Sequence, residues 1–503
     1  MIFALFVGFI VLLSFYNFYW KRRNLPPGPT PWPIVGNILE LKRAERWEDK
    51  FQEWKEKYGP VYTYWLGEIP FVSFNSYEKV HEYFIKRGED FADRPQVPKF
   101  DMLLRGGQFG VAFTSGALWK DQRKFAMKIL NSFGVGKNEM ENNVLNEVQY
   151  MFDRIDEGIK KGAKEQDLIR LTNMAVGSIT NMIVCGYSFT QSKKEEEFYY
   201  MRDLTTEAVE VATSALSNLG LNNPWILRLP YIGDNGNKTL KLFKEIFAFV
   251  DSKVQQHLRE NDYSQIAEPK DYIDAFLIEK MRLEEQGVTD HFYTVQQLRN
   301  ACFDLWVAGQ ESTSATIPWL FAYLIMNPDV QTKMQEELDK VIASDRMITT
   351  ADRPSLPYTN AVIMEAQRCG NVIAQNILHA TGKEVEVEGY VLPKQTTVVP
   401  QVSVIMQDPV AFPEPKKFNP DRFIDESGHI RSIKEFLPFS IGRRVCYGEG
   451  MAMMEIFDFT ANLFNRYKVS VGEKLPSMKK LAGNATEIHP YTVKVERRVP
   501  SYA

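Results

Sequence analysis

Apolar residues follow helical spacing over most of the chain. Helical patterns dominate from about residue 47 to 350, and short β-branched stretches, alternating in places, follow between 382 and 404. Spacing of three and four residues predicts helices buried on one face, whereas alternation predicts strands. The Pro-rich, charged stretch 407–438 has neither period and is typical of an ordered loop. The pattern therefore predicts a mainly α body with small β-sheets, an α+β fold.

The N-terminus carries the longest uncharged run. Residues 2–20 contain no charged side chain, and Lys21, Arg22 and Arg23 follow at once. Nineteen apolar or uncharged residues are about the length that a membrane span requires. A cleavable signal peptide is the alternative, but the run lacks a basic start and a small-x-small cleavage site. We therefore expect residues 1–23 to be a transmembrane signal anchor with a basic stop, and the positive-inside rule places the remaining chain in the cytosol.

A Pro-rich segment, 24–37, separates this anchor from the body. Its core is Pro26-Pro27-Gly28-Pro29-Thr30-Pro31, in which fixed φ angles and missing N–H groups favour a stiff extended hinge. A length of 503 residues suggests about three domains by size alone. The sequence after the hinge has neither an internal repeat nor a long polar linker, so we expect residues 38–503 to form one large domain.

Charge and cysteine content exclude two classes of protein. Sixty Lys+Arg against sixty-four Asp+Glu give a net charge of -4, so a nucleic-acid partner is not expected. Four cysteines in 503 residues, with no close Cys-x-x-Cys pair, exclude a disulfide scaffold and suit a reducing compartment. Composition alone does not rank these cysteines, which are Cys185, Cys302, Cys369 and Cys446.

Spacing does single out Cys446. It lies in Phe439-Ser-Ile-Gly442-Arg-Arg444-Val-Cys446-Tyr-Gly448, directly before a helix-compatible run. A cysteine there can accept backbone N–H groups and feel the positive end of the helix dipole, which favours thiolate. Gly442 and Gly448 permit positive φ or close approach to a flat ligand, and Arg444 offers a cation for a carboxylate. A buried, inert cysteine is the alternative, but chance would produce the whole pattern in only about 5 × 10⁻⁵ of such chains.

This segment resembles the haem-binding loop of the cytochrome P450 family. The resemblance implies that Cys446 is the metal ligand, the proximal thiolate of the iron of haem b, and that Arg444 pairs with a haem propionate. Thiolate ligation pushes electron density onto iron and favours O–O cleavage. It further implies the cytochrome P450 fold, with Phe439, Gly442 and Gly448 lining the cofactor.

A second motif, Ala308-Gly309-Gln-Glu311-Ser312-Thr313, lies in the apolar run 298–326. On a helix, Ala308, Glu311 and Ser312 share one face. The glycine leaves room against the backbone, for a bound group or for close helix packing. The motif resembles the family's oxygen-binding groove, which implies that Ala308 and Gly309 lie against haem and that an acid and an alcohol deliver protons to bound oxygen. Glu311 matches the acid, Ser312 stands where the family usually has Thr, and Thr313 follows.

Three further charged residues match the family's buried Glu-Arg-Arg triad. Glu365 and Arg368 are spaced i, i+3, and Arg422 follows in Pro420-Asp-Arg422-Phe423, where Asp421 replaces the usual Glu. Taken alone, Glu365 and Arg368 would form an ordinary surface ion pair. The resemblance implies a structural role.

Four other residues are expected to bind the cofactor by the same resemblance. Trp119 and Arg123 match the Trp-x-x-x-Arg of a helix flanking the haem, and Arg94 and His379 lie where microsomal animal members place propionate partners. His379 follows Leu378 rather than the usual Pro. The alternative for Arg94 and His379 is an ordinary surface or core position.

Together the motifs resemble, in family order, a microsomal animal cytochrome P450 of the drug-, fatty-acid- or steroid-metabolising group. This implies a monooxygenase that inserts one atom of O₂ into a lipophilic substrate at the endoplasmic reticulum membrane. Electrons would come from NADPH–cytochrome P450 reductase and in some members cytochrome b5. A haem isomerase or dehydratase that needs no external electrons and a membrane-held haem sensor are the alternatives.

Two expectations concern surfaces. Lys120, Lys124 and Lys128 recur every four residues, which predicts a basic stripe that docks an acidic flavoprotein or is simply solvated. By family analogy the substrate site is lined by residues 96–113, residues near 207–222, Val307, Ala308 and residues 371–376, most of which are apolar or small.

Overall fold

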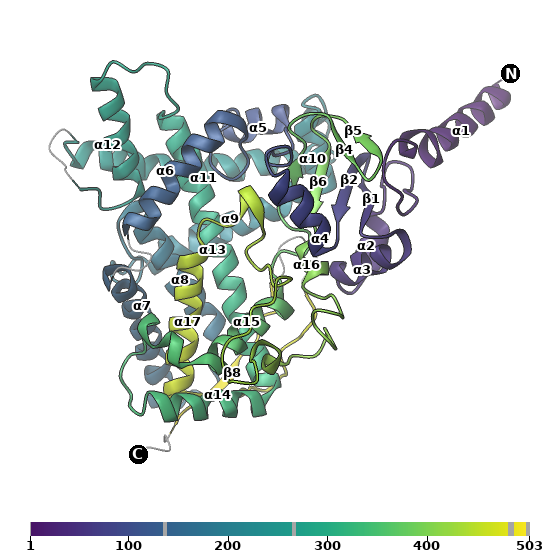
Figure 1. Cartoon of the computed structure of the whole chain (residues 1–503). Coiled ribbons are helices and arrows are strands. Elements are labelled where there is room, and N and C mark those ends of the chain that lie inside the picture. The colour runs from purple at the N-terminus through teal and green to yellow at the C-terminus, as the bar shows by residue number, and fades with distance from the viewer. Residues whose placement is uncertain (1, 134–137, 264–267, 481–486, 499–503) are drawn as a thin grey trace.

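Helix α13 (Val295–Met326) runs through the middle of the molecule and packs against α8 (Leu168–Cys185) (Figure 1). The computed structural model describes residues 2–133, 138–263, 268–480 and 487–498. Thr294 caps α13, because its hydroxyl accepts the Gln297 N–H at 3.1 Å. Helices on both sides then bury most of this 32-residue helix, which explains why its sequence is apolar nearly all round.

The α-helices account for most of the chain, as the sequence predicts. The others are α1 (Ile2–Phe18), α2 (Ile38–Arg43), α3 (Trp47–Tyr58), α4 (Tyr77–Val80), α5 (Pro98–Arg105), α6 (Gly116–Phe133), α7 (Asn138–Lys160), α9 (Glu195–Thr213), α10 (Ala215–Asn222), α11 (Asp234–Glu260), α12 (Tyr272–Glu285), α14 (Pro328–Val341), α15 (Pro357–Gly370), α16 (Val402–Ile405) and α17 (Glu449–Arg466). The short turns are η1 (Trp20–Arg22), the π-helix η2 (His81–Lys86), η3 (Ile226–Arg228), η4 (Thr350–Ser355), η5 (Pro420–Phe423) and η6 (Gly442–Arg444).

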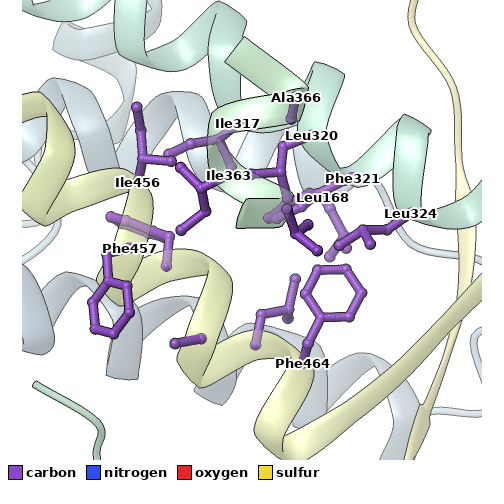
Figure 2. Packing of buried hydrophobic residues seen from close by; sticks show 14 of the residues in the cluster. Leu168, Ile317, Leu320, Phe321, Leu324, Ile363, Ala366, Ile456, Phe457 and Phe464 are labelled. Carbon is purple, nitrogen blue, oxygen red and sulfur yellow. The ribbon is translucent and has the colours of Figure 1, made fainter. Parts of the chain in front are cut away.

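The main hydrophobic core lies where α7, α8, α13, α15 and α17 meet. Figure 2 shows Ile317 and Leu320 of α13 packing toward Ile363 of α15 and toward Phe457 and Phe464 of α17. These five side chains are fully buried. The largest core cluster therefore joins the helix that carries Glu311 to the helix that follows Cys446.

Small sheets lie to one side of the helices. The largest has the strand order β1-β2-β6-β3, in which β1 pairs antiparallel with β2, and β2 runs parallel to β6. The strands are β1 (Val61–Leu66), β2 (Ile69–Phe74), β3 (His379–Ala380), β4 (Val385–Val387), β5 (Tyr390–Leu392), β6 (Thr397–Pro400), β7 (Tyr467–Val471) and β8 (Val493–Arg497). The predicted strands between 382 and 404 are confirmed as β4, β5 and β6.

Two strands that the pattern does not predict, β1 and β2, lie within the region 47–350, where helices dominate as expected. Their sequences are rich in aromatic and β-branched residues, and Gly67, with φ +62°, makes the turn between them. Both strands are mostly buried on both faces, so they lack the alternation that marks a half-buried strand.

The Pro-rich segment lies against the body, whereas the sequence predicts a spacer. Thr63 N–H on β1 donates to Pro27 O at 3.0 Å, and a Cβ at Gly28 would lie 1.8 Å from Thr63 O. Asn17 Nδ2 of α1 donates to Pro31 O at 2.8 Å. Fixed φ angles at the prolines keep the segment extended. Its backbone carbonyl groups can therefore accept hydrogen bonds from N–H groups at the edge of β1.

Helix α1 projects away from the body (Figure 1). Its exposed side chains include Phe9 and Leu12, at 62% and 68% exposure. By length and apolar composition, α8 is the one described helix that passes as a membrane span, but 78% of that stretch is buried inside the protein, so α8 is a core helix. The membrane insertion of α1, which has 17 residues, stays a prediction.

Candidate active site

The cysteine loop ends where α17 begins. Cys446 N–H donates to Phe439 O at 3.0 Å, and Val445 N–H donates to Gly442 O at 3.1 Å, so the chain turns tightly before the helix. The Cys446 residue is exposed, whereas Cys302 and Cys369 are buried. The loop therefore presents one accessible thiol at the N-terminus of α17.

The protein around this residue acts against ionisation of its thiol. Desolvation by neighbouring protein atoms raises the pKa of Cys446 above its ordinary value, although the residue is exposed, and the Gly448 N–H and the Arg123 charge act in the opposite direction. A bound metal cation would favour the thiolate at this position. That Cys446 is held as a thiolate stays a prediction.

The two glycines of the cysteine loop have different conformations and different neighbours. Gly442 has φ +79°, and a Cβ there would lie 2.2 Å from Phe84 O, so the loop approaches η2 at this point. Gly448 has φ -94° and precedes α17, and a Cβ there would be in ordinary contact, 3.8 Å from Cys446 Sγ. Gly442 therefore has the positive φ that the sequence allows and lies close to the Phe84 backbone, whereas Gly448 has a negative φ. Close approach of either glycine to a flat ligand stays a prediction.

Three arginines gather beside the loop, and we call Arg94, Arg123 and Arg444 the arginine cluster. Their guanidinium groups donate mainly to backbone carbonyls. The contacts are Arg94 Nη1 to Leu378 O at 2.6 Å, Arg94 Nε to Ala112 O at 3.0 Å, Arg123 Nη2 to Val445 O at 2.6 Å, Arg444 Nε to Ala92 O at 2.7 Å and Arg444 Nη2 to Thr114 O at 2.6 Å.

The arginine cluster is not compensated by a direct ion pair. Among residues 2–133, 138–263, 268–480 and 487–498, none of the three pairs with a carboxylate. Burial, together with the neighbouring Arg123, lowers the pKa of Arg94 to about 9. Burial and the charges of Arg94 and Arg123 lower that of Arg444 to about 8, against a raising effect of Asp93. Trp119, also buried, lies under the Arg444 guanidinium, 3.7 Å from ring centre to Cζ. Such a cluster favours an anionic ligand.

Helix α13 carries the predicted acid and alcohol on one face. Ala308 is exposed although most of α13 is buried, and Ser312 Oγ donates to Ala308 O at 2.8 Å. Burial and the charge of Glu487 raise the pKa of Glu311 to about 7, against a lowering by Arg202. Glu311 Oε1 is buried and has no hydrogen-bond partner in the part of the chain that the structure describes. Glu311 can therefore hold or release a proton near neutral pH.

Gly309 and Thr313 lie elsewhere on the helix. A Cβ at Gly309 would lie 2.9 Å from Thr180 Oγ1 of α8, so the missing side chain makes room for a neighbouring helix. This is the close packing that the sequence leaves open as the alternative. Thr313 is 3% exposed, so its hydroxyl is less accessible than that of Ser312.

Comparison with known proteins agrees with this arrangement. The cytochrome P450 family model matches residues 26–495. The chain belongs to the cytochrome P450 family. It is 33% identical to cytochrome P450 2C16 of Oryctolagus cuniculus over 92% of this chain and 91% of that protein, and 33% identical to cytochrome P450 2D3 of Rattus norvegicus over 91% and 90%. Human cytochrome P450 2C8 is 31% identical over 95% and 94%.

Cytochrome P450 proteins bind haem b through a cysteine thiolate, and the residues of this chain fit that group. Haem b carries an iron cation and two carboxylates. An accessible thiol suits the cation, and the uncompensated arginine cluster suits the carboxylates. The donor set is therefore complementary in charge to the cofactor at both positions.

The predicted triad forms between α15 and η5 of this cytochrome P450 domain. Glu365 accepts from Arg368 Nε at 2.7 Å and Nη2 at 2.8 Å, and from Arg422 Nε at 3.0 Å. Asn419 N–H adds a fourth bond at 2.9 Å, and both Glu365 and Arg368 are 0% exposed. The buried arrangement is confirmed, and the surface ion pair is excluded.

The sequence leaves two roles open for His379 and two for the lysine stripe. His379 is buried, its Nδ1–H donates to Phe91 O at 2.8 Å, and burial and the charge of Arg94 hold its pKa well below the usual range. A neutral ring with its proton on Nδ1 adds neither a charge nor an Nε2 donor for a propionate, so the proposed propionate contact would require a protonated ring or the other tautomer. Lys120, Lys124 and Lys128 are all exposed on α6, as docking and simple solvation both require.

One functional pair was missed by the sequence analysis. Arg105 of α5 and Asp304 of α13 form a buried ion pair at 2.8 Å, and Asp304 Oδ2 accepts the N–H groups of Val111 and Ala112 at 2.8 and 2.9 Å. The pair ties the predicted substrate-lining stretch 96–113 to the helix one turn before Ala308. Asp304 is the one charged residue between 300 and 310, and that isolation was the available signal.

Proposed function

We propose that Cys446 would hold the iron of haem b as its thiolate ligand and that the chain is a haem-thiolate monooxygenase acting on a lipophilic organic substrate. The observation that carries the residue assignment is the accessible Cys446 thiol beside the uncompensated arginine cluster. The monooxygenase class follows from the family. When bound, haem supplies the redox chemistry that activates O₂.

The chain's own residues would hold the cofactor, supply protons and contact the substrate. Arg94, Arg123 and Arg444 hold the cofactor's carboxylates, and Trp119 N–H adds a donor from α6. Glu311 holds a proton near neutral pH, and Ser312 Oγ, which donates to Ala308 O, keeps its lone pairs free to accept one. The exposed faces of Ala308 and Phe113 provide apolar contact for a substrate.

The requirement for external electrons distinguishes a monooxygenase from an isomerase or dehydratase and from a haem sensor. With purified protein, NADPH oxidation should require both the substrate and NADPH–cytochrome P450 reductase, because the described fold shows neither a flavin nor an NADPH module of its own. A spectral-shift screen with fatty acids, steroids and xenobiotics should supply the substrate. Product formation without reductase would indicate an isomerase or dehydratase, and binding without turnover would indicate a sensor. Omission of cytochrome b5 tests its contribution.

Ser312 should govern how much of the consumed NADPH becomes product. Ser312→Ala removes the hydroxyl that passes a proton on, so we expect more peroxide per NADPH and about tenfold less product, short of the ~10²-fold typical of a lone proton donor because Glu311 remains. Ser312→Thr, with its restricted χ1, should keep or improve product yield. Peroxide and product are measured per NADPH. An unchanged ratio in Ser312→Ala would move the role to Thr313 or water.

We also propose that α1 anchors the protein in the endoplasmic reticulum membrane with the body in the cytosol. The relatives suggest an endoplasmic reticulum membrane protein. Seventeen helical residues span about 26 Å, and Tyr19 and Trp20 extend the apolar stretch toward the ~30 Å hydrocarbon core. Deleting residues 1–23 should release most of the protein from sedimented membranes. Retention of all of it would assign binding to another surface.

A further inference from the structure

A buried carboxylate joins two cations beside the end of α15. Glu48, in the first turn of α3, is buried, and its Oε1 accepts from Arg46 Nη2 at 2.8 Å and from Lys480 Nζ at 2.5 Å. Burial alone would raise the pKa of Glu48, but the charges of Lys480 and Arg46 lower it to about 2, so the carboxylate is ionised at neutral pH. We call Arg46, Glu48 and Lys480 the Glu48 cluster.

Both cations of the Glu48 cluster also donate to backbone carbonyls where α15 ends. Arg46 Nη2 donates to Cys369 O at 3.2 Å, and Lys480 Nζ donates to Asn371 O at 3.0 Å. The last carbonyls of a helix have no partner within that helix, and Asn371, with φ +39°, ends α15 in the left-handed conformation. The two side chains therefore fix the direction in which the chain leaves α15.

The chain that leaves α15 leads to the candidate active site. Asn376 Nδ2 donates to Ser440 Oγ of the cysteine loop at 3.1 Å. Arg94 of the arginine cluster donates through Nη1 to Ile377 O at 3.3 Å. The predicted substrate-lining stretch 371–376 is thus bonded to the Glu48 cluster at its start and to the candidate site at its end.

The first residues of this stretch lie between two anchors. Lys480 donates to Asn371 O, and Ser403 Oγ donates to Ala374 O at 2.7 Å. Between these bonds, residues 372 and 373 are valine and isoleucine, and both are half-buried. Movement of Asn371 O would therefore move two apolar side chains of the predicted lining.

We propose that the Glu48 cluster is a positioning device, which holds residues 371–373 at the wall of the substrate pocket through its bonds to Cys369 O and Asn371 O. Lys480 and Glu48 are then positioning residues that act through the backbone. The proposal rests on the proposed function, because the pocket is that of the monooxygenase.

Energetics favour positioning over simple stabilisation. A buried ion cluster adds little net stability, because removing its charges from water costs about as much as their attraction gains. Each cation here is bonded both to Glu48 and to a carbonyl, so it cannot move without breaking a buried hydrogen bond. Such fixing matters for catalysis, since a misplacement of about 1 Å can cost about 10²-fold in rate.

Three variants test the device. Lys480→Met removes the donor to Asn371 O and leaves Glu48 paired with Arg46, whereas Lys480→Arg keeps a cation and its donors. The matched control is Lys479→Met. Lys479 precedes Lys480 in the chain and pairs with Glu45 at 3.6 Å, but both side chains of that pair are exposed.

Ligand binding to the holoenzyme at pH 7 reports on the pocket wall. Imidazole binds haem iron through one nitrogen, and the phenyl group of 4-phenylimidazole extends from there into the pocket. Both are titrated by the shift in haem absorbance. In Lys480→Met, 4-phenylimidazole should bind about threefold more weakly relative to imidazole, because an apolar contact is displaced. Lys480→Arg should restore most of the ratio, and Lys479→Met should match wild type.

The ratio of the two dissociation constants separates positioning from stability. It does not depend on how much of the protein is folded or loaded with haem, since both ligands are measured on the same bound population. A wild-type ratio in Lys480→Met, or an equal change in Lys479→Met, would overturn the proposal.

A second measurement needs neither ligand nor turnover. Amide hydrogen exchange, followed by mass spectrometry on peptides that cover 371–376, should be about tenfold faster in Lys480→Met than in wild type and unchanged in Lys479→Met. Unchanged exchange in Lys480→Met would show that Lys480 does not hold the stretch. Faster exchange with a wild-type ratio of dissociation constants would leave a purely structural contact and overturn positioning.

These outcomes are distinguishable from failure of the proposed function. If wild type shows no thiolate-type carbon monoxide spectrum or no reductase-dependent NADPH oxidation, the function fails. The exchange measurement on the protein as purified still decides whether the Glu48 cluster holds residues 371–373, since it depends on neither electrons nor substrate.

Discussion

Cys446→Ser should abolish the thiolate-type carbon monoxide difference spectrum and all reductase-dependent product formation. Serine keeps the size of the side chain and the Cys446 N–H bond to Phe439 O, so the loop should fold as before. Its hydroxyl does not ionise near neutral pH, so it cannot supply the electron-rich sulfur that thiolate ligation requires.

The matched control is Cys185→Ser. Cys185 ends α8, packs against the buried cluster that includes Phe276 of α12, and has a thiol whose pKa is raised by burial. This variant should keep the spectrum. A thiolate-type spectrum that survives Cys446→Ser and is lost with another cysteine would contradict the assignment.

Glu365→Gln should be the most destabilising single polar substitution considered. The glutamate accepts four N–H hydrogen bonds, three of them from two guanidinium groups, and has no exposed surface. An amide leaves Arg368 and Arg422 buried without their counter-ion, which costs about 3 to 5 kcal/mol in the free energy of unfolding. We expect a lower denaturation midpoint and a low yield of haem-loaded protein, with the substrate preference of the surviving fraction unchanged.

Glu279→Gln is the control for this substitution. Glu279 pairs with Arg282 at the same i, i+3 spacing on α12, but the arginine is half exposed. Its loss should cost less than about 1 kcal/mol. Equal midpoints for the two variants, measured by urea unfolding, would show that the Glu365 pair contributes no more than a surface ion pair.

Local spacing in the sequence was enough to predict several residues of the candidate site. The Phe439–Gly448 pattern, the Glu311-Ser312 pair and the Glu365-Arg368 pair each depend on a few neighbouring residues, and a loop or helix fixes their geometry. The arginine cluster needed more than spacing, because Arg94, Arg123 and Arg444 come from three distant segments. Their assembly was predictable only through the family resemblance.

What the sequence could not supply were contacts between distant elements. Gly442 is a glycine because Phe84 O approaches it, and Gly309 because Thr180 does, yet neither neighbour is close in sequence. The mostly buried strands β1 and β2 lack the alternation on which strand prediction depends. Lys480 holds Asn371 O across 109 positions, and Asp304 holds Val111 across 193, so no local period records either contact.

The arginine cluster also has a consequence for the amount of protein in the cell. Without an anionic ligand, three mutually repelling guanidiniums raise the free energy of the folded apoprotein, whereas the unfolded chain spreads them in water. A ligand that binds only the folded form stabilises it by about 4 kcal/mol at a thousandfold excess over its dissociation constant. Haem supply should therefore set the steady-state abundance of this enzyme, because newly made chains that remain empty are the ones that quality-control proteases remove first.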